Sequence, residues 1–165
     1  MDKQVLRNKF FYLALSAVLI SIIYWSCYSL NAYHTYQEYG DVGLSAYDMY
    51  YHIHYASILN GFQYLVFANH ISPDQLFILP IFALFPSVPT LLFIQAIVIS
   101  LTGLVIFFVS RTIIKNEKIS LLLCLAFLIN PGTFGILLFD YHAEMLLPIL
   151  FMLMFYLIKS SLSHL

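Results

Sequence analysis

The chain has 165 residues, of which 62% are hydrophobic and 9% are charged, with a formal net charge of −1 and a mean hydropathy of +0.88. A soluble domain carries about 45–50% apolar and about 25% charged residues. The composition therefore excludes an ordinary soluble globular protein and indicates an all-α membrane protein with several spans. We expect the lipid bilayer as its main partner, and no nucleic acid.

Four apolar segments are predicted to cross the membrane within a single domain that covers residues 1–165. The first follows three basic residues, as in a signal peptide, but it is long enough at about 1.5 Å per residue to cross a core of about 30 Å, and no small-residue cleavage site follows. We expect an uncleaved anchor. The third segment contains Asn130-Pro131-Gly132, which predicts a turn or kink. The four predicted spans are residues 10–30, 90–110, 119–139 and 143–158.

A long loop over residues 31–89 separates the first two spans, and it is rich in Tyr, His and carboxylates. Apolar residues recur every three or four positions over residues 44–60, which predicts a helix lying in the membrane interface. Residues 75–85 are apolar but too short to span, and Pro80 is expected to interrupt them. We predict a second interfacial or re-entrant helix there.

The basic residues indicate the topology. With four crossings and a cytoplasmic N-terminus, all seven Lys and Arg residues fall on the cytoplasmic side, as the positive-inside rule requires. Six of the eight carboxylates and five of the six histidines then fall outside. We expect a protein of the plasma membrane with both termini in the cytoplasm and any chemistry on the outer face.

The segment Phe139–Glu144 combines charge and apolar surroundings. Asp140, His142 and Glu144 alternate there, and ionisable groups at the edge of hydrocarbon suggest a functional site. Carboxylate and imidazole ligands suit a divalent ion such as Mn, Mg or Zn, and His70 of the outer loop could complete the set. The alternatives are a helix cap formed by Asp140 and a His–carboxylate pair.

The apolar limbs on either side of residues 130–144 are short, at roughly 11 and 14 residues against the ~20 needed to span. The segment could therefore dip below the headgroups. Irregular backbone is tolerated at that depth only where it is buried in protein or lines a cavity, so the sequence points to a cavity. A weaker ligand set is formed by Asp48, His52 and His54, because two histidines two positions apart on a helix point in different directions.

Six short elements follow one another along the chain: Asp41-Val42-Gly43-Leu44, Asn69-His70-Ile71-Ser72-Pro73, Leu79–Pro86, Leu91–Ala96, Asn130-Pro131 and Phe139–Glu144. In this order they resemble the motifs of the DUF2079 family, an uncharacterised prokaryotic family of predicted membrane proteins. Ala143 stands where the family has Pro. Members of the family usually continue for several hundred residues, so the resemblance implies a truncated or split version.

The family in turn resembles the GT-C membrane glycosyltransferases, whose first outer loop contains interfacial helices and an acidic residue. This resemblance implies that the chain forms the N-terminal part of a GT-C-like fold, and that a polyprenyl-phosphate-linked sugar is the donor. Asp41 would then be the general base or a metal ligand, with His70, Asp140, His142 and Glu144 as metal ligands or their hydrogen-bond partners. Composition alone favours a solvated turn residue between two glycines, and the position of Asp41 together with the resemblance makes the two interpretations about equal.

Three functions remain open from the sequence. One is a GT-C-like glycosyltransferase; another is a non-catalytic truncated paralogue or accessory subunit with a partner that supplies further spans; the third is a small metal-binding or transport component. A bound lipid phosphate needs positive charge beside it, and no Lys or Arg is expected outside. Either a metal ion supplies that charge, or a missing C-terminal part does, or no such donor is bound.

Overall fold

The computed structural model describes residues 3–35, 43, 45–47, 49–50, 75–138, 141 and 143–162. These residues are almost entirely helical, and no strand occurs among them. The all-α architecture expected from the sequence is therefore confirmed. The helices are α1 (Lys3–His34), α4 (Gln75–Leu84), α5 (Val88–Ile114), α6 (Glu117–Leu128), α7 (Pro131–Leu138), the 3-10 helix η1 (Ala143–Leu146) and α8 (Leu147–Leu162).

Two helices are long and apolar enough to cross a membrane: residues Lys9–His34 of α1 and the whole of α5. Helices α6 and α7 meet at an angle of 41° and count as a third candidate if the bent pair is one span. α8 offers a shorter apolar stretch, Leu147–Lys159. Whether α8 crosses the bilayer, as predicted for residues 143–158, stays a prediction.

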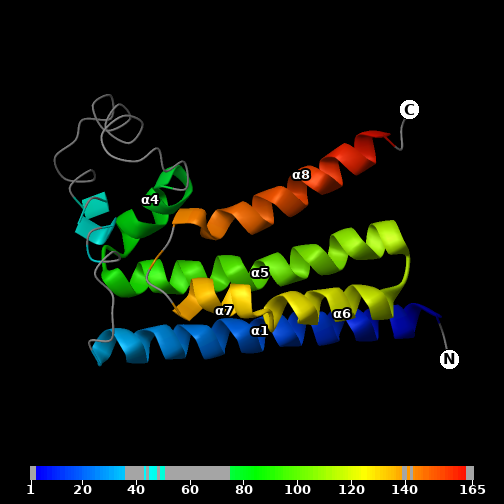
Figure 1. Cartoon of the computed structure of the whole chain (residues 1–165), viewed down its shortest axis with the longest axis horizontal. Helices are drawn as coiled ribbons and strands as arrows, with labels where there is room; N and C mark the ends of the chain where they lie inside the picture. The colour runs from blue at the N-terminus through cyan, green and yellow to red at the C-terminus, as the bar shows by residue number, and fades with distance from the viewer. Residues whose placement is uncertain are drawn as a thin grey trace.

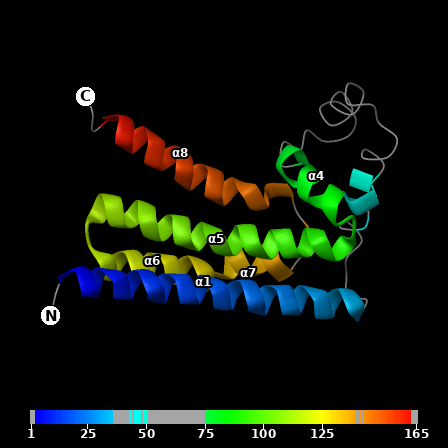
Figure 2. The same ribbon diagram turned by 180° about the vertical axis from the view of Figure 1, so that it is seen from behind.

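Helix α5 is the centre of the bundle, with α1, α6 and α8 packed around it (Figures 1 and 2). One buried cluster, built on Ala14, Val18, Phe107, Cys124 and Leu128, joins α1, α5 and α6. A larger cluster lies toward the end where α4, the start of α5 and the start of α8 meet. Within α1 the buried residues recur at Ala14, Val18, Trp25 and Ala32, which is the spacing of one helical face.

The helix ends follow local chemistry. Helix α5 begins after Ser87, with Pro89 in the first turn, where a missing N–H is harmless. It ends at Lys115, which adopts the left-handed conformation at φ 56°. Asn116 then caps α6 by accepting hydrogen bonds from the backbone N–H groups of Lys118 and Ile119. A turn of two residues therefore suffices to reverse the chain.

The break between α6 and α7 occurs where Asn130-Pro131-Gly132 predicts it. The side-chain oxygen of Asn130 accepts from the N–H of Gly132 at 2.7 Å, and the Thr133 hydroxyl donates to the Phe127 carbonyl at 2.8 Å. These bonds satisfy polar groups that the interrupted helix would leave free. By contrast, Pro80 does not interrupt α4 as expected: the helix runs through it, and Ile78 and Phe82, four residues apart, are both buried.

The seven basic residues lie at one end of the molecule. The start of α1, the turn between α5 and α6, and the end of α8 are together at that end (Figures 1 and 2). These three regions contain all the Lys and Arg of the chain: Lys3, Arg7, Lys9, Arg111, Lys115, Lys118 and Lys159. Arg111 forms an ion pair with Glu117 at 2.7 Å across the turn. The opposite end holds α4, η1 and the larger apolar cluster.

Candidate functional site

The residues proposed for chemistry lie almost entirely outside the described part of the chain. This applies to Asp41, His70, Asp140 and His142, and to the weaker candidates Asp48, His52 and His54. The backbone of Glu144 is described and belongs to η1. The roles assigned to these side chains therefore stay predictions, and the structure is informative about their neighbours in sequence.

These neighbours meet in one buried cluster. Ala46 and Met49, from the segment that contains Asp48, are 8% and 1% exposed. Tyr141, which separates Asp140 from His142, is 4% exposed, and Met145, which follows Glu144, is fully buried. All four belong to the larger cluster. Two segments about 90 residues apart in the sequence, each rich in candidate side chains, are thus anchored in the same apolar core.

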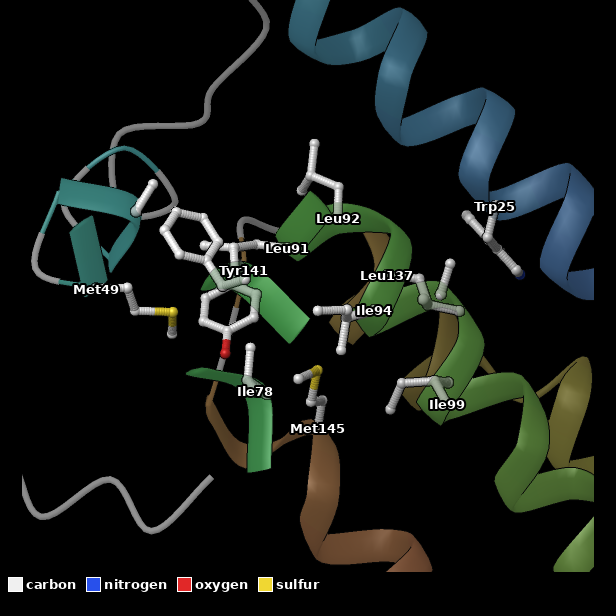
Figure 3. Close-up of a cluster of buried hydrophobic side chains, with 13 residues drawn as sticks. Trp25, Met49, Ile78, Leu91, Leu92, Ile94, Ile99, Leu137, Tyr141 and Met145 are labelled. Atoms are coloured by element: carbon white, nitrogen blue, oxygen red, sulfur yellow. The ribbon is translucent and has the colours of Figure 1, made fainter. Parts of the chain in front are cut away.

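Helix α4 and the first turns of α5 supply the rest of this anchor. Figure 3 shows Ile78 of α4 and Leu91 and Ile94 of α5 around Tyr141, with Met49 and Met145 beside them. Because these side chains interdigitate from four segments, a shift of one segment would disturb the others. This larger cluster, called the apolar platform below, therefore joins the described residues of both candidate segments to α4 and α5.

Helix α7 and α1 extend the platform toward the bundle. Trp25 of α1 packs on Phe134 of α7, with ring centroids 5.2 Å apart, and Tyr28 and Tyr24 pack in turn on Trp25. Leu137 of α7 is 1% exposed and belongs to the same cluster. Apolar and aromatic contacts thus join α1 and α7 to the larger cluster.

Polar side chains also form contacts between the described helices. The hydroxyls of Ser21 and Ser100 lie 2.9 Å apart and link α1 with α5. The side-chain N–H of Gln95, a residue only 2% exposed, donates to the Ile136 carbonyl of α7 at 3.0 Å. In the sequence Gln95 is a strongly polar residue within an apolar span, and the sequence gives it no partner.

Sequence reasoning also missed Tyr141 as an anchor. The signal was present: in Phe139–Ala143 the apolar residues alternate with Asp140 and His142, and a period of two separates two faces of an extended chain.

The donor set proposed for a metal ion fits Mn, Mg or Zn by its oxygen and imidazole chemistry. Within the helices and short segments that the structure describes, no group of three His, Cys, Asp or Glu side chains is suitably arranged for an ion. Cys27 is exposed and Cys124 is buried, and neither forms a disulfide. His70, Asp140, His142 and Glu144 as metal ligands stay a prediction, as does the weaker set Asp48, His52 and His54.

A family model described as "Predicted membrane protein (DUF2079)" matches residues 41–164. The chain belongs to this family. The match begins at Asp41 and includes the anchored segments, α4 and all helices from α5 onward. Searches of curated proteins and of solved structures give no match. Membership of the family and the apolar helices together establish a membrane protein.

Proposed function

We propose that this protein contributes an outer-face active site of the GT-C type, which transfers a sugar from a polyprenyl-phosphate carrier to an acceptor hydroxyl. The observation that carries the proposal is the shared apolar platform: Met49 and Ala46 from one candidate segment pack in the same cluster as Tyr141 and Met145 from the other. Residues adjacent in sequence to these anchors supply the acid–base and metal-binding groups. The GT-C assignment itself rests on resemblance of architecture.

In the proposed reaction, Asp41 accepts the proton of the acceptor hydroxyl as that oxygen attacks the anomeric carbon of the sugar. The new glycosidic bond forms while the bond from the anomeric carbon to the polyprenyl phosphate breaks. The phosphate leaves with the electron pair. His70, Asp140, His142 and Glu144 would hold a divalent ion, which supplies positive charge for the leaving phosphate.

The distribution of basic residues supports this need for a metal ion and the proposed orientation. All seven Lys and Arg lie in segments at the end opposite the apolar platform. By the positive-inside rule, that end faces the cytoplasm of a plasma-membrane protein, and both termini lie there. A phosphate at the platform end would meet none of the chain's own cations.

The test is sugar transfer in membrane vesicles that contain the full chain, with polyprenyl phosphate carrying a radiolabelled hexose as donor. We expect Asp41→Ala to abolish transfer at unchanged membrane levels. Asp74→Ala removes another carboxylate of the same loop that is given no role, and should transfer at the wild-type rate. Transfer by Asp41→Ala equal to wild type, or no transfer by wild type with any hexose tried, would refute the proposal.

A second candidate is an accessory membrane subunit that packs on a partner supplying further spans. The observation that favours it is α8, whose large apolar residues are exposed around the helix, including Phe151 (65%) and Leu157 (64%). This helix packs on α5 and η1 and leaves the rest of its surface uncovered in the monomer. Full transfer activity of the purified monomer would exclude the accessory role.

A further inference from the structure

We infer that Gln95 is a positioning residue: its side-chain amide binds the last turn of α7 and so fixes the helix that precedes the segment Phe139–Glu144 in the sequence. The inference concerns the site of the proposed function and rests on it for its importance. Its test, however, measures the segment itself and not sugar transfer.

The last turn of α7 has backbone carbonyls without partners inside the helix. This helix ends at Leu138. The Ile136 carbonyl is therefore one of its last four backbone carbonyls, which accept no hydrogen bond from an N–H of the same helix. Leu137, the next residue, is 1% exposed and lies in the apolar cluster. A carbonyl beside apolar side chains is costly to leave without a hydrogen-bond donor.

Gln95 supplies that donor from another helix. Its N–H lies 3.0 Å from the Ile136 oxygen, and the residues on either side of it, Ile94 and Ala96, are buried in the same cluster. A buried amide is unfavourable unless it is hydrogen-bonded. The two groups therefore satisfy each other, and α7 is held at one register along α5.

Two other buried polar residues of α5, Thr102 and Ser110, do not have this geometry. Thr102 is fully buried, but its hydroxyl donates to Val98, four residues earlier in the same helix. Ser110 likewise donates to Ile106 and Phe107 of α5. These two hydroxyls are satisfied by carbonyls of α5 itself and hold no other segment in place. Thr102 is thus a matched control for Gln95.

The experiment is amide hydrogen exchange of the full chain in lipid nanodiscs, read by mass spectrometry. We expect Gln95→Met, which keeps the length but lacks a donor, to raise exchange about tenfold in peptides covering residues 133–146, as loss of one buried hydrogen bond would. Exchange in α6 should change less than twofold. Thr102→Val should leave residues 133–146 within twofold of wild type.

A conservative replacement separates positioning from general stability. Gln95→His keeps a side-chain N–H at a similar distance from the backbone, and should return exchange of residues 133–146 to near the wild-type rate. The inference is overturned if Gln95→Met leaves that region unchanged, if it loosens α5, α6 and α7 equally, or if Gln95→His exchanges as fast as Gln95→Met. If these results are as expected while Asp41→Ala transfers normally, only the proposed function fails.

Discussion

Gly103 sits where α5 passes closest to α6, and it offers a sharp test of how the bundle is packed. A Cβ built on Gly103 would lie 2.9 Å from Cδ2 and 3.1 Å from Cγ of Leu128, and 3.5 Å from Sγ of Cys124. Leu128 is itself 6% exposed and Cys124 is fully buried. An added methyl group at Gly103 therefore cannot be accommodated without movement of Leu128.

The expected magnitude follows from two opposing terms. Alanine in a helix interior is favoured over glycine by about 0.5–1 kcal/mol, while overpacking a filled core costs about 1–3 kcal/mol. We predict that Gly103→Ala destabilises the protein by about 1 kcal/mol. Gly135 of α7 is the control, because nothing lies within 4 Å of a Cβ built there. Gly135→Ala should stabilise by about 0.5–1 kcal/mol.

The assay is reversible unfolding of the full chain in bicelles, with Leu128→Ala as the third variant. Leu128→Ala alone should cost about 2–4 kcal/mol by leaving a cavity. In the Leu128→Ala background the contacts at 2.9 and 3.1 Å are gone, so Gly103→Ala should become stabilising. If Gly103→Ala has the same effect in both backgrounds, or stabilises as much as Gly135→Ala, the close approach of α5 and α6 is wrong.

Two further contacts give predictions of their own. Trp25→Ala should destabilise the protein by about 3 kcal/mol, because Trp25 packs on Phe134 and is 5% exposed. Trp25→Phe should cost less than half as much. Equal losses for the two variants, measured by unfolding in bicelles, would contradict this. Ser21→Ala and Ser100→Ala should each cost about 0.6 kcal/mol, the average for hydrogen bonds between membrane helices. Because their hydroxyls pair with each other, the double variant should cost little more than either; fully additive costs would argue against the pair.

Hydropathy predicted the long helices but not their ends. The first span was expected at residues 10–30, whereas α1 extends from Lys3 to His34. Hydropathy indicates where lipid surrounds a helix, and a helix continues into the headgroup region wherever its residues permit it. Helix α4 differs from the expectation for another reason. Pro80 removes one backbone donor, but Ile78 and Phe82 on either side of it are buried, and the helix continues through Pro80.

The contacts between segments could not be predicted from the sequence. The sequence marks Gln95 as unusual because it is polar within an apolar span, but Ile136 lies 41 residues away and nothing local identifies it. The serine pair spans 79 residues. By contrast, Asn130-Pro131-Gly132 produced the expected break, since turn chemistry is encoded within a few residues.

We propose that the segments of Asp41 and Asp140 serve one site beside the apolar platform. Cross-linking of Asp41→Cys with Asp140→Cys, in a chain whose own cysteines are replaced by Cys27→Ser and Cys124→Ala, tests it in native membranes. We predict efficient cross-linking by short bis-maleimides, detected by mass spectrometry, and none between Asp41→Cys and Lys115→Cys, since Lys115 lies at the opposite end. Absence of the first cross-link in folded protein, or equal yields for both pairs, would contradict the claim.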